Sequence, residues 1–420
     1  MKTNFQIMIE LLAVIPRHFF LIFCVFVYLS IVRSLRYKRC HKIKSKFVKR
    51  PLSEMTAKEA YEIMQQLQEL EFPYNFHNSL SFGLLKTAGI PTISKLLVAT
   101  GNLSQKNASK RAADTEVLLA EVQYSDPTSE RYLQAVARIS FLHSRYRSSG
   151  KILDEDLLHT LSSGVVETFR FIDKFEWRTL TDVERCAIGV FHKNLGEGME
   201  IPFTPLPSCK EGWRNGLHFA NELEEWCYGY EKKVSGRTQS NMVLARRIMG
   251  VATASVPSFM RPIMKGVITA TMDEHMRISM GLENTSPILA SIIHVVRVIR
   301  KFIIRHFHLP RPNFMRVKIV ADAPNPASGL YNIHKYVVHP WYVKPSFGQR
   351  WGLKAWVVKW FGTGIVPGDL GDLYRPQGYD IRTVGPTAQE GKGIGEMEVN
   401  VEKLRGQKEM SCPFSFGNMR

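Results

Sequence analysis

A histidine among apolar and aromatic residues is the first candidate for chemistry in this 420-residue sequence. His143 follows Tyr132, Val136 and Ile139 at helical intervals and precedes Tyr146. This spacing predicts a helix over 128–147 with the imidazole on its apolar face. A neutral imidazole in such a place could ligate a metal. The same spacing also fits a core histidine whose ring nitrogens are satisfied by hydrogen bonds.

Three polar residues share one face of the preceding predicted helix, over 109–123. Arg111, Asp114 and Thr115 stand at positions i, i+3 and i+4, so a cation, a carboxylate and a hydroxyl lie side by side. They could line a polar pocket. The alternative is a surface ion pair between Arg111 and Asp114, and periodicity alone favours such structural roles for these residues and for His143.

Sharper catalytic motifs are absent from the sequence. It contains no HExxH zinc motif, no HxD or HxE start of an iron triad, no GxSxG elbow and no GxxxxGK[ST] phosphate loop. The six cysteines include no CxxC pair and none in the glycine-flanked setting of a P450 thiolate. The missing motifs therefore exclude HExxH zinc proteases, serine hydrolases with a GxSxG elbow, P-loop enzymes and P450s.

The first fifty residues have the composition of a membrane anchor. Residues 11–32 carry one charge, Arg17, and as a helix would span roughly 33 Å, about the thickness of a bilayer core. Residues 33–50 hold nine Lys and Arg and no acid, so the positive-inside rule places this flank and the following body in the cytosol. This flank supplies half of the net charge of +18, which argues against nucleic-acid binding. Pro16 and Arg17 leave an interfacial anchor as the alternative.

The rest of the chain has the periodicity of an all-α protein. Capping-box pairs at Thr56 with Glu59 and at Thr181 with Glu184 predict two helix starts. Proline and glycine predict a loop over 72–91. Helical spacing predicts further helices over 109–123, 128–147, 154–172, 215–231, 241–254 and 258–280.

After Pro310 the chain becomes rich in proline, glycine and aromatic residues, which predicts a covering arm. We therefore expect an anchor over 1–50, a helical domain over 51–310 and an arm over 311–420. The last helix before the arm, over 286–307, mixes isoleucine and valine with Arg297, Arg300 and Arg305. It could lie with its basic residues on an anionic membrane face, or pack on the core with those residues solvated.

Six sequence strings carry a resemblance to a known family. They are LEFPYNF (70–76), GIPTIS (89–94), ARISFLHSRYRSSGKILDEDLL (137–158), RFIDKFEWRTL (170–180), VPGDLG (366–371) and YRPQGY (374–379). With these strings, residues from about 55 to 412 resemble the fungal endoplasmic-reticulum-bound oxygenases typified by MpaB of mycophenolic acid biosynthesis. More distantly, RxxDT at 111–115 and RxxxxH at 138–143 are similar to motifs of latex-clearing rubber oxygenases, which are b-haem proteins with a globin-like helical core.

The resemblance assigns roles to the residues above. It implies that His143 is the axial ligand of a haem b iron, and that Arg111, Asp114 and Thr115 form the distal catalytic face, with Arg111 also binding the cofactor. Asp114 takes the place of the distal lysine of the rubber oxygenases, and an aspartate would accept protons or hydrogen bonds instead. The glutamate base of those enzymes has no counterpart over 83–101.

The expected protein is thus a single-pass oxygenase of the endoplasmic reticulum membrane with a cytosolic body and a globin-like haem core. The resemblance implies an O2-dependent reaction on a lipophilic prenylated intermediate of a fungal secondary-metabolite pathway. This reaction would be either oxidative cleavage of a C=C bond or oxygenation. The expected partners are this substrate, O2 and membrane lipid, with no nucleic acid and no identified redox partner. The alternatives are a non-enzymatic membrane scaffold and a metal-dependent hydrolase or isomerase acting on a lipid-like substrate.

Overall fold

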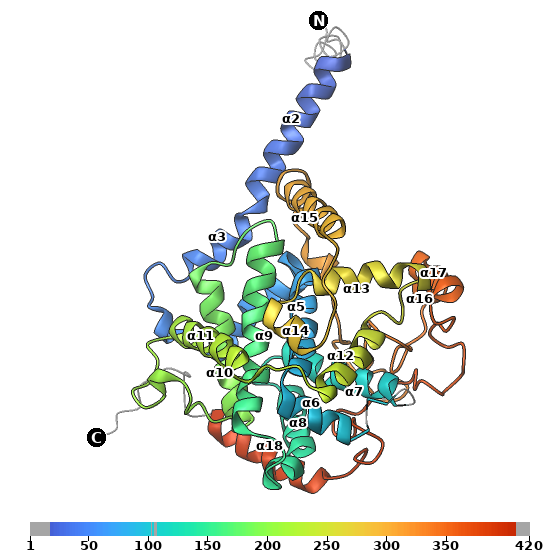
Figure 1. Ribbon diagram of the computed structural model, residues 1–420. Coiled ribbons are helices and arrows are strands. Elements are labelled where there is room, and N and C mark those ends of the chain that lie inside the picture. Colours follow the sequence, from blue (N-terminus) through green and yellow to red (C-terminus); the bar gives the residue numbers. More distant parts are fainter. Residues whose placement is uncertain (1–16, 102, 105–106, 409–420) are drawn as a thin grey trace, which may run out of the picture.

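The computed structural model describes residues 17–101, 103–104 and 107–408, and within them the protein is all-helical (Figure 1). The extended pairings in this part of the chain are two isolated bridges, Val320 with Ile333 and Tyr331 with Tyr379. The all-α fold class is therefore confirmed. A globin-like haem core stays a prediction.

Five helices form the centre of the body. α9 packs against α5 and α11, and α10 packs against α4 and α11. Their core includes Phe72, Phe169, Phe191 and Phe219, each at most 1% exposed. The five helices are α4 (Ala57–Gln66), α5 (Pro73–Lys86), α9 (Asp154–Phe175), α10 (Asp182–Gly198) and α11 (Gly216–Val234).

Both predicted capping boxes are confirmed. The Thr56 hydroxyl accepts from the Glu59 backbone N–H at the start of α4, and the Thr181 hydroxyl does the same for Glu184 at the start of α10. In each case the glutamate side chain bonds back to the N-cap backbone N–H. Two N–H groups that the helix leaves free are thereby satisfied at each start.

The predicted loop over 72–91 is wrong. This segment forms α5, which begins at Pro73, and the next helix, α6 (Pro91–Ala99), begins at Pro91. Proline suits the first helical position because its φ is preset and its missing N–H would have no helical partner there. The two prolines therefore mark helix starts.

The single helix predicted over 258–280 is also wrong. The segment forms η5 (Ser258–Met260), α13 (Arg261–Thr269) and α14 (Glu274–Ser279). Asp273, the N-cap of α14, has an extended backbone, and its carboxylate lies 2.9 Å from the Lys86 ammonium group of α5. An ion pair between distant residues thus lies at the break between α13 and α14. The spacing of residues along the sequence does not predict this contact.

The remaining predicted helices are confirmed, with ends that differ by a few residues. α7 and α8 form a hairpin, and α12 packs against α6 and α7. α15 lies near the anchor at the top of the view in Figure 1. Their bounds are α7 (Ala108–Tyr124), α8 (Glu130–Ser148), α12 (Gln239–Ala252) and α15 (Pro287–Phe307).

The anchor helix projects from the body (Figure 1). α2 (Arg17–Arg36) continues into α3 (Lys38–Ser45), and together they are long and apolar enough to cross a membrane. Residues 11–16 of the predicted span lie outside the described residues. The pair Pro73–Gly89 and Pro91–Ala99 passes the same test of composition, but it bends by 90° and α5 contributes to the core.

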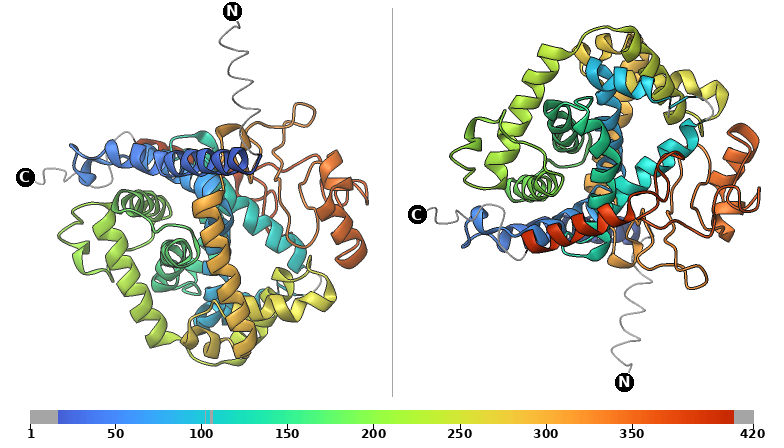
Figure 2. Two further views of the ribbon diagram at one scale, coloured as in Figure 1. Left: turned by 90° about the horizontal axis from the view of Figure 1, so that it is seen from above. Right: turned by 90° about the horizontal axis from the view of Figure 1, so that it is seen from below.

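The carboxyl-terminal arm wraps the body and enters its core. Val320, Tyr342, Tyr379 and Met397 are buried with the body's own core residues. The arm contains α16 (Phe347–Trp351), α17 (Leu353–Phe361) and α18 (Ile394–Lys408). α18 packs along α8 and crosses the face seen from below (Figure 2, right).

Candidate functional site

The α7–α8 hairpin carries all the residues to which the sequence assigns chemistry. Ser129 caps α8 by accepting from the Tyr132 backbone N–H. Asp126 and Thr128 shape the turn before it, because the Asp126 carboxylate accepts from the Thr128 N–H at 2.8 Å. The two helices pack against each other along the hairpin. The fold therefore brings Arg111 near His143.

Arg111 and Thr115 are hydrogen-bonded to each other and half-buried. Thr115 Oγ1 also donates to the Arg111 carbonyl at 2.7 Å. Burial lowers the pKa of Arg111, and the Asp114 carboxylate opposes this effect. Arg111 and Thr115 thus lie side by side on one face of α7, as the sequence predicts.

His143 is half-buried, and its Nδ1 atom is buried without a hydrogen-bond partner among the described residues. Burial, and then the Arg111 and Arg147 cations, lower the pKa of His143 to about 4. The ring is therefore neutral at physiological pH, the form in which imidazole ligates a metal. A core histidine satisfied at both nitrogens is not what the structure shows. These properties fit a residue that would ligate the iron of a haem.

Asp114 has other partners. Its Oδ1 accepts from the Tyr342 hydroxyl at 2.8 Å, and its Oδ2 accepts from the Lys110 ammonium group at 2.9 Å. Burial raises the pKa of Asp114, while Lys110 and Tyr342 lower it. The alternative of a surface ion pair with Arg111 is wrong, because the Asp114 side chain is 1% exposed and pairs with Lys110. The carboxylate joins α7 to the arm, and its part in a reaction stays a prediction.

Arg138, the arginine of RxxxxH, holds the arm in place. Its fully buried guanidinium donates to four backbone carbonyls of the arm at 2.6 to 3.1 Å. They belong to Thr383, Val384, Gln389 and Lys392. Since Arg138 and His143 share α8, the arm fixes the helix that carries the candidate ligand.

A second arginine, on a helix that packs against α7, has a nitrogen without a hydrogen-bond partner among the described residues. Arg247 lies on α12, which packs against α7, and its Nη1 atom is buried without a hydrogen-bond partner in the described part of the chain. A buried guanidinium nitrogen without an acceptor is costly. An anionic group on a ligand would satisfy it.

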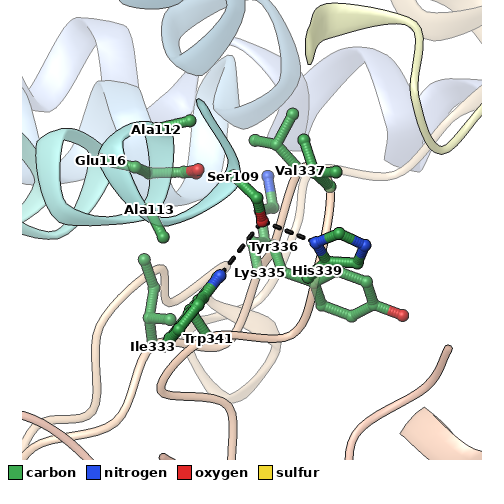
Figure 3. Close-up of a pocket in the computed structure, with 11 residues that line it drawn as sticks. Ser109, Ala112, Ala113, Glu116, Ile333, Lys335, Tyr336, Val337, His339 and Trp341 are labelled. Carbon is green, nitrogen blue, oxygen red and sulfur yellow. Dashed lines mark hydrogen bonds between the residues drawn. The ribbon is translucent and has the colours of Figure 1, made fainter. Parts of the chain in front are cut away.

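A pocket lies between α7 and the arm, on the face of α7 that carries Ser109, Ala112 and Glu116 (Figure 3). Ser109 Oγ lies 2.7 Å from His339 Nδ1 and accepts from Trp341 Nε1 at 3.1 Å. The pocket has about 260 Å³ of space, part of it open to solvent. Only about 10 Å³ of it is open to the centre of a water-sized molecule, which is room for about one water. It is too small for the expected prenylated substrate.

Glu116 borders this pocket and was not singled out by any sequence pattern. Burial raises its pKa to about 7, against the opposing effect of Lys335 and Lys354. Its Oε1 lies 3.7 Å from Nε2 of His77, whose pKa is lowered to about 4 by burial and then by Lys335. This raised pKa makes the Glu116 carboxyl a candidate proton donor or acceptor near neutral pH.

A buried ion cluster lies between α5, α9, α11 and α14. The Lys86 ammonium group is fully buried and lies 3.1 Å from Glu167, 2.8 Å from Glu231 and 2.9 Å from Asp273. Burial alone would lower the pKa of Lys86, but these three carboxylates outweigh it and raise the pKa. No helical spacing predicts this cluster, because four separate helices supply it.

Part of this cluster could hold a metal ion. Ligand atoms of His159, Cys227 and Glu231 lie within 4.8 Å of one another. However, Lys86 already binds Glu231 Oε1, and burial raises the pKa of Cys227 to about 12, which keeps the thiol protonated. The donors are therefore arranged around an ammonium ion, and a metal would have to displace it.

The curated proteins that resemble this chain are all named ER-bound oxygenases. No protein-family model matches the chain. The chain is 39% identical over 391 residues to the ER-bound oxygenase mpaB' of Penicillium brevicompactum, with 92% of each chain covered. It is 39% identical over 355 residues to the ER-bound oxygenase mpaB of the same species, with 84% of each covered. The mpaB of Penicillium roqueforti is 40% identical over 257 residues, 60% of this chain and 86% of that one.

Proposed function

Because the chain belongs to the family of ER-bound oxygenases typified by MpaB, we propose that it is a membrane-anchored oxygenase that uses haem b and O2 on a lipophilic prenylated substrate. The observation that carries this proposal is the 39% identity to mpaB', which covers 92% of both chains. A match of this length takes in most of the chain. The exposed apolar helix α2 supports membrane attachment.

The chemistry of the hairpin supports haem as the cofactor. His143 would hold the iron, because its neutral imidazole has a buried nitrogen without a partner. Arg111, whose charge acts on His143, would pair with an anionic edge of the cofactor. Bound haem supplies the O2 chemistry.

The chain's own groups have separate tasks in this proposal. The Arg111 guanidinium donates hydrogen bonds and orients the Thr115 hydroxyl, which can hold a proton at Oγ1. Asp114 acts as a positioning residue, since its carboxylate fixes Lys110 and Tyr342. The arm, held by Arg138, keeps α8 and therefore His143 in place.

The substrate is an apolar, prenylated intermediate of a fungal secondary-metabolite pathway, of the meroterpenoid or terpenoid type. Oxidative C=C cleavage or oxygenation of its prenyl chain is the reaction we propose. Such a molecule partitions into the bilayer, so an anchored body has access to it. The basic flank of α2 and α3 supports a cytosolic body in the endoplasmic reticulum membrane.

The test uses the full chain purified in detergent or nanodiscs. We expect a Soret band, iron by elemental analysis, and O2 consumption with a prenylated substrate. His143→Gly should lose the haem, and added imidazole should restore part of it, because the free ligand can occupy the vacated position. His192→Ala is the matched control, since Nδ1 of this buried imidazole donates to the Ile188 carbonyl instead.

Full haem occupancy in His143→Gly without imidazole would overturn the ligand assignment. A wild-type protein without haem, whether metal-free or carrying zinc, would overturn the haem proposal. Zinc that is lost on Glu231→Gln substitution would favour the alternative of a metal-dependent hydrolase, because Glu231 belongs to the one cluster of potential metal ligands among the described residues. A folded protein without metal, haem or turnover would favour the scaffold.

A further inference from the structure

α15 turns its apolar residues outward. Nine large apolar side chains of this 21-residue helix are exposed, whereas Ile293 is buried. A surface helix on a water-soluble body has the opposite arrangement. The exposed residues are Ile288, Ile292, Val295, Val296, Val298, Ile299, Phe302, Ile303 and Phe307.

Two arginines of α15 face the body instead. Arg297 donates to Thr271 Oγ1 at 2.6 Å and lies 3.9 Å from the ring centre of Phe175. Arg300 binds the Glu176 carboxylate at 3.0 Å and the Phe175 carbonyl at 3.1 Å. Arg297 and Arg300 therefore contact the protein. The sequence predicts that the basic residues of this helix lie either on lipid headgroups or in solvent, and both predictions are wrong for these two arginines. Polar contacts hold the helix to the protein, and its apolar side is left open.

The anchor helix lies against α15. The Tyr28 hydroxyl of α2 donates to the Phe307 carbonyl at 2.7 Å. Tyr28 precedes Arg33 by five residues, so this contact lies roughly 8 Å from Arg33 toward the apolar end of α2. Interfacial helices bury their apolar faces about 5–10 Å into the headgroup and acyl boundary. With Arg33 at the membrane surface, the end of α15 stands at that depth.

We propose that α15 is a second membrane contact, whose exposed apolar side lies among the lipid acyl chains of the leaflet that α2 enters. The occupant is lipid because this surface is continuous with α2, the apolar candidate span. Seen from above, from the side on which α2 projects, α15 crosses the middle of the body (Figure 2, left). The proposal rests on the membrane anchor of the proposed function, and it does not depend on haem or on oxygenase activity.

The apolar surface continues beyond α15. α13 packs against α15, and Phe259, which precedes α13, contacts Phe361 of α17 with ring centres 6.5 Å apart. Phe259 is 69% exposed, and Trp356 and Trp360 on α17 are 53% and 68% exposed. Tryptophan is enriched at membrane–water interfaces. α17 thus forms the rim of the proposed contact.

Photo-crosslinking to lipid tests the proposal on the full chain. Benzoylphenylalanine replaces Val296 on α15 in one variant and Val399 on α18 in a matched control, since both valines are exposed, at 58% and 73%. Each variant is placed in nanodiscs of phosphatidylcholine with alkyne-tagged acyl chains. After irradiation, we expect at least five times more tagged lipid on the Val296 variant. The readout is independent of turnover, so loss of oxygenase activity alone leaves the result unaffected.

Equal lipid labelling of the two variants, or none on the Val296 variant, would overturn the proposal. Crosslinking of the Val296 variant into a dimer without lipid adducts would overturn it in favour of a second copy of the chain. A variant at Tyr28, which lies on the anchor helix itself, serves as the positive control. If the Tyr28 variant also fails to label, the failure lies with the anchor of the proposed function.

Discussion

Arg111 and Asp114 lie one helical turn apart on α7 and have different partners. Arg111 bonds to Thr115, whereas Asp114 bonds to Lys110 and to Tyr342, 228 residues further along the chain. Spacing could predict which residues share a helix face. It could not predict Tyr342, because that contact depends on the path of the arm.

Asp114→Asn tests how the carboxylate acts. We expect this variant to retain haem and to lose about 2 kcal/mol of unfolding free energy, because a buried charge-assisted bond to Lys110 is replaced by a neutral one. Tyr342→Phe removes the other partner and serves as the control. If the carboxylate takes part in proton transfer, only Asp114→Asn lowers kcat. Equal kcat in both variants and wild type would leave Asp114 with a structural role alone.

Glu116 predicts a pH dependence of stability. Burial raises its pKa to about 7, so the folded state binds its proton more tightly than the unfolded state, whose glutamate has a pKa of about 4.3. The stabilisation from this group is full below about pH 4 and is lost as the pH rises through about 7. The groups that face Glu116 are His77, Lys335 and Lys354.

Glu116→Gln should therefore flatten the fall in unfolding free energy between pH 5 and pH 8, as measured by denaturant titration at each pH. Glu398→Gln is the control, because this carboxylate of α18 is exposed. A wild-type curve that stays parallel to the Glu116→Gln curve over this interval contradicts the raised pKa.

At the level of the helices, local signals and tertiary contacts can be told apart. Capping boxes predicted α4 and α10 because hydrogen bonds within four residues decide these starts. Spacing does not predict the starts of α5 and α6, because proline is common both in loops and at the first position of a helix. The break before α14 depends on Asp273 binding Lys86, a contact across 187 residues, and so could not be predicted from spacing.

Arg138→Lys should loosen the arm. A lysine has one ammonium group and cannot reach the four carbonyls that the guanidinium binds, so we expect a loss of about 3 kcal/mol or more of unfolding free energy. Limited proteolysis should cut within 383–392 first. Arg145→Lys on the exposed side of α8 is the control. An arm that resists protease equally in both variants would show that Arg138 does not hold it.

For the whole molecule, the topology gives a further prediction. The basic residues that follow α2 predict a cytosolic body, so its sequons at Asn107 and Asn284 should carry no glycan although both asparagines are exposed. A sequon tag added before Met1 should be glycosylated. Digestion of microsomal protein with endoglycosidase H, read as a gel shift, measures both. A glycan on Asn284 would contradict the cytosolic orientation and show that the body lies in the lumen.

The junction between anchor and body is short and is held by side-chain contacts. α2 runs into α3 with one residue between, Arg36 lies 4.2 Å from the ring centre of Trp177, and Arg39 binds the buried carboxylate of Glu71. A catalytic body on a flexible tether tumbles and meets the bilayer in every orientation. The contacts at the junction hold this body in one orientation on its anchor, so the same side of the protein always faces the bilayer.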